Sequence, residues 1–219
     1  MNIINYPFQQ AALKNNTKIL IDTCFLLSLL YDKDPKNPEC IMTLKKLKLA
    51  DCKLFTNDII TAEFINQIQK KLFLDDIKYR ILHTEPVNTP SNVELILACF
   101  SKNDRKLIKE RKLEKFHHIP FNKYFYNISK NEWKKDLLKV YFDKSVDSHS
   151  EIERSLNLSH MAIDSSSVAL AKDLMKKYML SVNDAYHLAC AELNNIDYLL
   201  TLDCDFEEMS KLKVNILKI

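Results

Sequence analysis

The sequence predicts an α/β protein with three layers, in which a parallel β-sheet lies between two layers of helices and a mostly helical insertion interrupts the chain. Short apolar runs that suit buried strands alternate with helical patterns near both ends of the 219-residue chain. The middle of the chain contains Lys-rich helical patterns and no clear strand. A chain of this length with 47% hydrophobic residues can bury a sizeable core.

The expected core consists of two parts of the chain. In the first part, apolar runs predict strands at 17–21 and 53–56. Turn residues separate three predicted helices, at 23–31, from Pro38 to about residue 50, and from 57 or 58 to about residue 72. Asn57 or Asp58 is expected to cap the third helix. The second part predicts helices at 165–177 and 181–194 and strands at 197–202 and 214–218. Because helices separate these strands, the strands are expected to pair in parallel.

This alternation divides the chain into three segments. Residues 1–17 are expected to be an N-terminal leader, 18–72 and 160–219 the core, and 73–159 the helical insertion. Within the insertion, residues 102–144 hold 13 Lys and Arg against 6 Asp and Glu, interleaved with aromatic residues. This combination suits single-stranded RNA, and Lys134, Lys135 and Lys139 are candidate contacts. An amphipathic helical subdomain with an aromatic core explains the same pattern, and both interpretations can hold together.

The composition excludes several kinds of site. The chain has no glycine, which excludes the Gly-rich nucleotide-binding loops and the G-x-S-x-G elbow. Its six cysteines form no C-x-x-C pair, so a structural zinc site is not expected. Scattered thiols and the lack of an apolar run in residues 1–17 favour a cytoplasmic protein. The near-apolar run at 19–31 is too short to span a membrane.

Acidic residues stand at the ends of the expected elements. Asp22 follows the first strand, Glu63 lies in the helix after the second strand, Asp184 begins a later helix, and Asp203 and Asp205 follow the next strand. Each acid also has a local explanation. Asp22 can cap the following helix, Glu63 can form a hydrogen bond with Gln67 one turn on, and Asp184 can form a capping box with Ser181. Asp203 and Asp205 can belong to a turn.

The joint placement of these acids is more informative than any one of them. The carboxyl ends of parallel strands meet at one edge of a sheet, and ligands bind there in open α/β sheets. Carboxylates gathered at that edge repel one another unless a cation neutralises them. Oxygen ligands suit Mg²⁺ or Mn²⁺, and these ions assist reactions of phosphate esters.

The order of the motifs D-T, E, D-x-x-H-x-A and T-x-D-x-D-F resembles the PIN domain, a metal-dependent nuclease fold. The matching stretches are residues 19–23, 56–63, 183–189 and 200–206. The resemblance implies a quartet of Asp22, Glu63, Asp184 and Asp203 that holds Mg²⁺ or Mn²⁺, with Asp205 as an auxiliary ligand and with Thr23, Asn57 and Thr201 as supporting residues. Two features depart from the family, which often has Asn or Ser at the position of Cys24 and a short helical connection in place of 73–159.

The resemblance implies a ribonuclease in which water held by the metal attacks the phosphodiester and Asp203 or Glu63 orients that water. His187 is interpreted as a structural helix residue, and Cys24 as a small packing residue.

The alternative functions are a toxin ribonuclease of the VapC type and a non-catalytic scaffold that binds RNA or protein. A dehalogenase-type phosphatase would need D-x-D where this chain has Cys24. The expected partners are RNA, single-stranded or structured, an antitoxin-like protein and a second copy of the chain, with no membrane.

Overall fold

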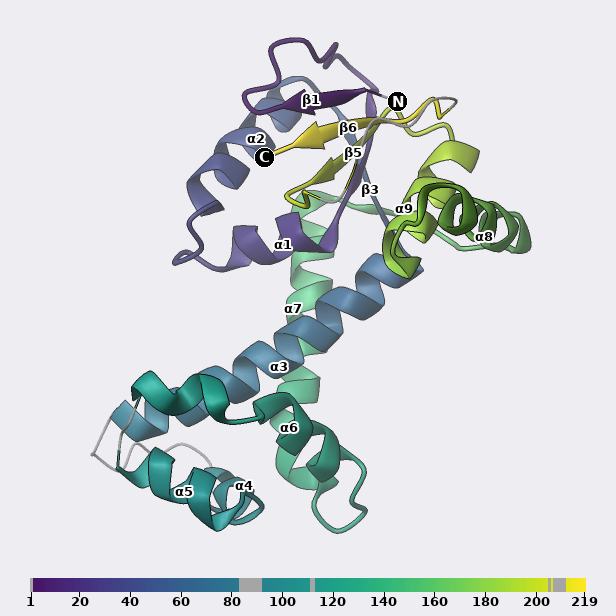
Figure 1. Ribbon diagram of the computed structural model, residues 1–219. Helices are drawn as coiled ribbons and strands as arrows, with labels where there is room; N and C mark the ends of the chain where they lie inside the picture. The colour runs from purple at the N-terminus through teal and green to yellow at the C-terminus, as the bar shows by residue number, and fades with distance from the viewer. Residues whose placement is uncertain (1, 83–91, 111–112, 205, 207–211) are drawn as a thin grey trace. The chain divides into compact units, whose positions relative to one another are not determined.

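The computed structural model describes residues 2–82, 92–110, 113–204, 206 and 212–219. The chain divides into two compact units, which we call unit 1 (Met1–Phe64 and His149–Ile219) and unit 2 (Ile65–Ser148). Two long helices, α3 (Asp58–Leu82) and α7 (Lys139–Leu156), contribute residues to both units (Figure 1). No helix of the described residues is both long enough and apolar enough to cross a bilayer.

Unit 1 contains a six-stranded sheet in which every neighbouring pair of strands is parallel. Its strands are β1 (Ile3–Asn5), β2 (Lys18–Ile21), β3 (Lys53–Asn57), β4 (Ser159–Met161), β5 (Tyr198–Thr201) and β6 (Asn215–Lys218), in the order β1-β6-β5-β2-β3-β4. Residues 19–21 of β2 and 198–200 of β5 are continuous buried apolar runs because both faces of these strands are covered.

Helices flank the sheet, so the predicted α/β fold is confirmed. Helices α1 (Thr23–Leu30) and α2 (Asn37–Leu49) lie on one side, and α8 (Ser165–Tyr178) and α9 (Val182–Leu193) lie on the other (Figure 1). The expected strands and helices of the core all form, and most of their ends differ from the predicted ends by about one residue. The exception is α3, which was expected to end near residue 72 and continues to Leu82, within the segment assigned to the insertion.

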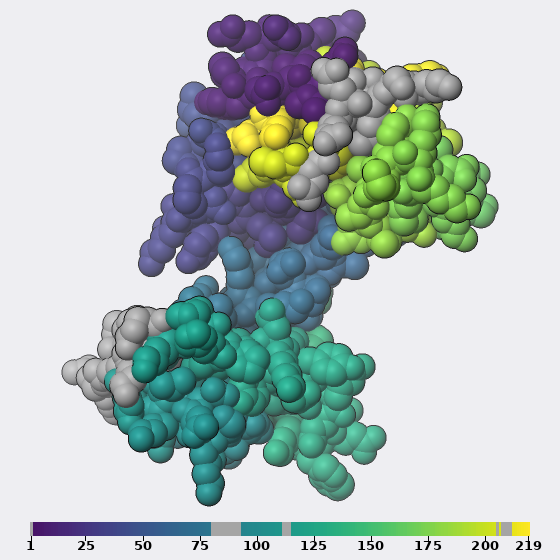
Figure 2. Space-filling model, in the orientation of Figure 1, coloured from purple at the N-terminus to yellow at the C-terminus, as the bar shows by residue number. Residues whose placement is uncertain are grey.

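The sequence does not predict the two edge strands, β1 and β4. Each has three residues, which is too short to show a period of two, and neither is mostly buried. Residues 1–17, expected to be a leader, contribute β1 to the sheet, where it pairs with β6. Figure 2 shows the purple N-terminal residues against the yellow C-terminal residues at this edge.

Unit 2 is helical and has an aromatic core of its own. It contains α4 (Asn92–Ala98), α5 (Lys102–Lys109), the 3₁₀ helix η1 (Leu113–His118), α6 (Phe121–Ser129) and the 3₁₀ helix η2 (Lys135–Leu138), together with parts of α3 and α7. The ring of Phe73 packs edge-on against Phe125 and Tyr141, with ring centroids 5.3 and 5.7 Å apart. Most of the interleaved aromatic residues therefore stabilise this unit, as one of the two interpretations predicts.

His149 of α7 is expected to make the stability of unit 1 depend on pH. Its ring is buried edge-on against Phe64, 5.6 Å between centroids, and its Nε2 has no partner among the described residues. Burial lowers the pKa of His149 below 6.5, as does His160, while Glu153 opposes the shift. The unfolded chain therefore binds the proton more readily, and we expect the free energy of unfolding to fall as the pH drops below about 6.5.

This expectation can be checked by denaturant unfolding, followed by far-UV circular dichroism, between pH 7.5 and pH 5. His149→Phe keeps a ring against Phe64 and removes the titrating group, so the loss of stability at low pH should be smaller. The control is His118→Gln, which changes an exposed histidine. Equal pH dependence in the wild type and in His149→Phe would show that His149 is not responsible.

Candidate metal centre

Asp22 stands at the carboxyl end of β2 and caps α1. Its backbone N–H donates to the carbonyl oxygen of Leu200, which continues the pairing of β2 with β5. Its Oδ1 accepts from the N–H of Thr23 at 2.6 Å, and its Oδ2 accepts from the hydroxyl of Thr201 at 2.6 Å. The helix cap expected from the sequence is therefore present, and it fixes a carboxylate that is only 7% exposed.

Thr201 connects two of the predicted ligands. It is the last residue of β5 and is fully buried. Its Oγ1 donates to Asp22 and accepts from the backbone N–H of Asp203 at 2.9 Å. The supporting role that the family resemblance implies for Thr201 thus has a physical basis in two hydrogen bonds.

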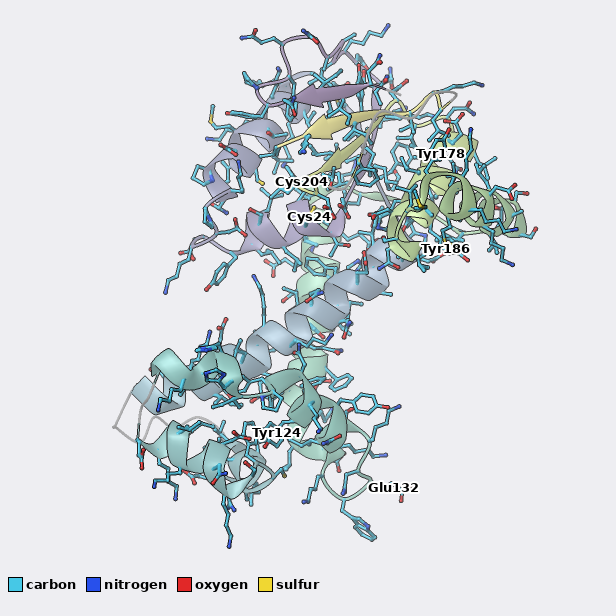
Figure 3. The ribbon with its side chains drawn as sticks, viewed as in Figure 1. Cys24, Tyr124, Glu132, Tyr178, Tyr186 and Cys204 are labelled. Carbon is cyan, nitrogen blue, oxygen red and sulfur yellow. The ribbon has the colours of Figure 1, made fainter. Side chains whose placement is uncertain are left out.

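Cys24 also contacts Asp22, which the sequence analysis does not anticipate. Its Sγ lies 3.0 Å from Asp22 Oδ2 and accepts from the N–H of Leu202 at 3.1 Å. Burial and the charge of Asp22 raise the pKa of the Cys24 thiol, so the sulfur keeps its proton and can donate it. Cys24 therefore supplies the polar contact that an Asn or Ser would make, and it is more than a packing residue. Figure 3 labels Cys24 at this edge of the sheet.

Glu63 reaches the same place from α3. Asn57, the last residue of β3, accepts from the N–H of Ile60 at 2.9 Å and so caps the helix that carries Glu63. Glu63 Oε2 accepts from the hydroxyl of Thr23 at 2.9 Å, and Oε1 accepts from the side-chain amide of Asn183 in α9. Glu63 is therefore turned towards α1 and α9.

The electrostatic environment of Glu63 favours its charged form. Burial alone would raise the pKa of Glu63, but hydrogen bonds from His187, Thr23 and Asn183 outweigh burial and hold the pKa below its ordinary value. Glu63 therefore remains a carboxylate at neutral pH even though it is only partly exposed to solvent.

His187 lies between the two carboxylates and is fully buried. Its Nε2 is 3.4 Å from Glu63 Oε2 and 3.7 Å from Asp22 Oδ1. Its Nδ1 has no hydrogen-bond partner among the described residues. A buried N–H without a partner costs more than a buried acceptor without one, so the neutral ring favours a proton on Nε2. This tautomer makes His187 a donor to Glu63, a contact that the structural interpretation of His187 did not include.

Asp184 has the local role that its position in the sequence predicts. The hydroxyl of Ser181 donates to Asp184 Oδ2 at 2.6 Å and accepts from the Asp184 N–H at 3.2 Å. Burial raises the pKa of Asp184, and the negative charges of Asp203 and Asp22 add to that effect, against the opposing contribution of Ser181. Asp184 thus lies in the first turn of α9, where Ser181 caps the helix, and is also an electrostatic neighbour of the two other aspartates.

The structure brings some of the predicted residues closer together than others. Ligand atoms of Asp22, Glu63 and His187 all lie within 4.8 Å of one another. A cation with ligand distances near 2.1–2.5 Å needs donor atoms no more than about 5 Å apart, so this set fits a divalent ion. Among the described residues, Asp184 and Asp203 are not part of that compact group. Asp205 lies outside the described residues.

The candidate lysines lie in unit 2 and are exposed. Lys139 forms an ion pair with Asp143 at 2.9 Å, and Lys135 lines a small surface hollow with Asp136. Lys134 precedes η2.

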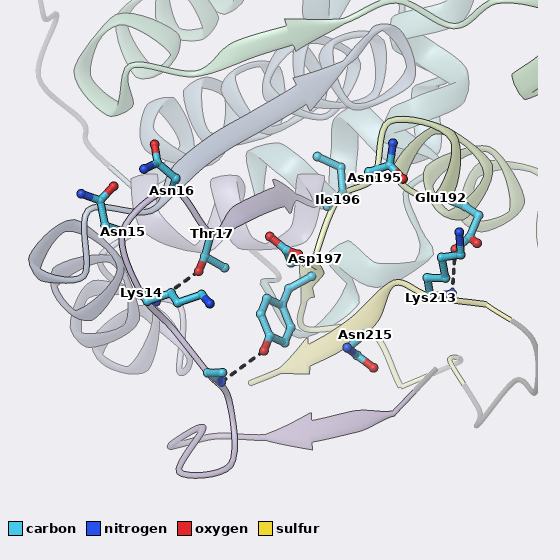
Figure 4. Close-up of a pocket in the computed structure, with 12 residues that line it drawn as sticks. Lys14, Asn15, Asn16, Thr17, Glu192, Asn195, Ile196, Asp197, Lys213 and Asn215 are labelled. Atoms are coloured by element: carbon cyan, nitrogen blue, oxygen red, sulfur yellow. Dashed lines mark hydrogen bonds between the residues drawn. The ribbon is translucent and has the colours of Figure 1, made fainter.

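A polar cavity of about 590 Å³ lies at the opposite edge of the sheet, where β2, β5 and β6 begin (Figure 4). Hydrogen bonds within its wall join Ala12 to the Tyr198 hydroxyl, Lys14 to Thr17 and Lys213 to Glu192. These contacts fasten the segments that lead into the strands. Of the predicted metal ligands that the structure describes, none lines the cavity. The acidic edge, at the carboxyl ends of the strands, is therefore the candidate site.

Comparison with known proteins finds a family match over part of the chain. The family model of the PIN domain matches residues 126–212, which are fewer than half of the 219 residues. This part of the chain is therefore similar to the PIN domain. The matched residues include Asp184, His187 and Asp203. Asp22 and Glu63 precede the match and reach the same site through β2 and α3.

The chain is also similar to the solved structure of VapBC2 from Rickettsia felis bound to a DNA fragment from the promoter. The two chains share 10% sequence identity, the match covers 90% of this chain and 97% of the other, and the TM-score is 0.40. No curated protein matches the chain. PIN domains are generally nucleases, so hydrolysis of phosphodiesters is the class of activity that this family supports.

Proposed function

We propose that this protein is a PIN-like, Mg²⁺- or Mn²⁺-dependent endonuclease that hydrolyses phosphodiester bonds and acts on RNA. The observation that carries the proposal is the convergence of Asp22 and Glu63 at the carboxyl edge of the sheet, within 4.8 Å of each other and of His187. Thr201, Cys24 and the helix cap fix Asp22. A pair of carboxylates held this closely and this firmly is costly without a cation.

In this proposal Asp22 and Glu63 hold the ion, and Asp184 and Asp203 complete the acidic site. When bound, a divalent ion neutralises charge on the phosphodiester and lowers the pKa of a water molecule. Both oxygens of Glu63 already accept hydrogen bonds from the protein. We therefore assign the orientation of the attacking water to Asp203, which is partly exposed beside Thr201.

RNA is the expected substrate because the chain carries a basic and aromatic segment in unit 2, which suits single strands. A non-catalytic scaffold would gain nothing from keeping all four acids. An antitoxin-like partner and a second copy of the chain remain predictions that depend on the family resemblance. All six cysteines are free, in agreement with the proposed cytoplasmic location.

The function can be tested with the full chain and a labelled RNA of mixed sequence. We expect cleavage with Mg²⁺ or Mn²⁺, no cleavage in excess EDTA, and recovery when the metal is restored. Calorimetry should detect Mn²⁺ binding in the absence of RNA. Cleavage that persists in excess EDTA would rule out a metal-dependent mechanism, and a chain that neither binds Mn²⁺ nor cuts RNA would support the scaffold.

A further inference from the structure

Helix α6 and the turn after it carry an exposed surface that the core of unit 2 does not use. We call this surface the α6 face and define it as Lys123, Tyr126, Lys130, Trp133 and Lys134. All five residues are exposed, Tyr126 by 60% and Trp133 by 93%. Neighbouring residues of α6, Phe125 and Ile128, point into the core instead.

The two aromatic rings of the α6 face differ from the other aromatic residues of the helix. Phe121, Tyr124 and Phe125 pack with the core cluster of unit 2. Trp133 leaves nearly its whole indole in solvent, where its apolar area contributes nothing to folding. The ammonium group of Lys130 lies 5.5 Å from the ring centroid of Tyr126. Large exposed rings beside cations are typical of a binding surface.

The turn that carries Trp133 is ordered by its own hydrogen bonds. Asn131 Oδ1 accepts from the N–H of Trp133 at 3.0 Å, and the carbonyl oxygen of Asn131 accepts from the N–H groups of Lys134 and Lys135 at 3.0 and 2.9 Å. Glu132, labelled in Figure 3, lies in this turn. Because the backbone is already fixed, little conformational entropy is lost when a ligand contacts the indole.

The charge of the segment favours an anionic ligand. Residues 121–135 contain four lysines, and their single acid is Glu132. In contrast, Lys106 of α5 and Lys139 of α7 are each in an ion pair with an acid four residues away. The α6 face therefore combines cations with aromatic rings in one short segment.

We propose that the α6 face binds single-stranded nucleic acid, with bases stacked on Trp133 and Tyr126 and phosphates held by Lys123, Lys130 and Lys134. A duplex keeps the faces of its bases stacked on one another, whereas a single strand leaves them free for aromatic side chains. Stacking accepts any base, so this binding is tolerant of sequence. The inference rests on the proposed function because it assumes that nucleic acid is the substrate.

Trp133 is the only tryptophan of the chain, so its fluorescence reports directly on this surface. Titration of the full-length Asp22→Asn protein, which keeps the RNA intact, with a 20-nucleotide oligo(U) should quench the emission in a saturable manner. The same binding curve should appear in fluorescence anisotropy of a labelled oligo(U), and a duplex of equal length should quench less. Saturation by anisotropy with unchanged Trp133 emission, or no binding at all, would overturn the proposal.

Substitutions separate stacking from charge. Trp133→Ala and Tyr126→Ala should each weaken binding by roughly fivefold or more, since stacking on one ring is worth that much per base. Lys123→Ala, Lys130→Ala and Lys134→Ala together should reduce the slope of log affinity against log salt by about two units.

The matched control removes three lysines from α5, Lys102, Lys106 and Lys109, and should leave Trp133 quenching unchanged. Equal losses in both triple variants would indicate non-specific attraction and contradict the assignment to the α6 face. A partner protein would instead shift the emission to shorter wavelength without a response to oligo(U).

The outcomes for the surface and for the enzyme can be told apart. Metal-dependent cleavage by the wild type, with no change of Trp133 fluorescence, would support the nuclease and contradict the proposed role of the α6 face. Quenching of Trp133 by oligo(U) in a chain that cleaves RNA with neither metal would support the α6 face and contradict the nuclease. Circular dichroism of each variant should match the wild type, because the changed side chains are exposed.

Discussion

Replacing Asp22 with asparagine should lower kcat/KM for RNA cleavage by roughly 1000-fold or more, which is about 4 kcal/mol of lost transition-state stabilisation. Asp22 belongs to the compact group of candidate ligands and contacts both Thr201 and His187. Asparagine removes the negative charge but keeps one oxygen that can accept from the N–H of Thr23. Cleavage rates should be measured over a range of Mn²⁺ concentrations, so that weaker metal binding is separated from slower chemistry.

The fold should survive this substitution. The amide of the new asparagine can donate to the hydroxyl of Thr201, which can rotate to accept, and one repelling charge is removed from the site. We therefore expect an unchanged or slightly raised Tm. Asp197→Asn is the matched control, because Asp197 accepts from the N–H of Lys18 at the opposite edge of the sheet. Wild-type activity in Asp22→Asn, or an equal loss in Asp197→Asn, would contradict the proposed metal centre.

The sequence predicts the centre of the fold better than its edges, for a physical reason. Strands β2 and β5 are covered on both faces, so most of their residues form apolar runs that are visible without a structure. Strands β1 and β4 have three residues each and lie at the edges, where few side chains are constrained by burial. Their pairing depends on neighbouring strands, and no pattern within three residues can show it.

Site residues were predictable to the extent that each follows from a strand end or from the family resemblance. Asp22 and Asp203 follow strands, so the parallel sheet alone places them at one edge. The contacts of Cys24 and His187 depend on how α1 and α9 pack around Asp22. One signal for His187 was present in the sequence, since a polar residue three positions after Asp184 falls on the helix face that also carries Leu188 and Ala191. That signal does not show which carboxylate the imidazole ring of His187 contacts.

The aromatic residues of unit 2 show a second limit of sequence analysis. Composition alone does not show which aromatic residues form a core and which lie on an RNA surface. Only the structure shows that Phe125 is buried while its neighbour Tyr126 is exposed. The direction of each side chain depends on how α6 packs, and packing involves residues far away in the chain, such as Phe73 and Tyr141.

Substitutions of His187 should divide into two classes according to whether they keep a hydrogen-bond donor. His187→Leu removes the donor to Glu63 Oε2 and leaves the carboxylates of Asp22 and Glu63 without the ring between them. We expect kcat/KM or the apparent metal affinity to fall by about 10–100-fold, the usual effect of losing a partner that orients a metal ligand. His187→Gln can still donate an N–H to Glu63 and should recover most of that loss. His160→Gln is the control, because His160 also lies near a carboxylate, 3.2 Å from Asp58 Oδ1, outside the acidic cluster.

The alternative role for His187 is direct ligation, and the same variants distinguish the two roles. A nitrogen ligand favours metals such as Zn²⁺ and Ni²⁺ over Mg²⁺, whereas a site of carboxylates alone favours Mg²⁺ and Mn²⁺. If His187 only positions Glu63, then metal preference should be the same in the wild type and in His187→Gln, and only His187→Leu should need more metal for half-maximal activity. If His187→Gln is as inactive as His187→Leu and its order of metal preference changes, then the ring binds the metal itself. The tautomer inferred from the unpartnered Nδ1 would then be wrong, because a ligating Nε2 must carry no proton.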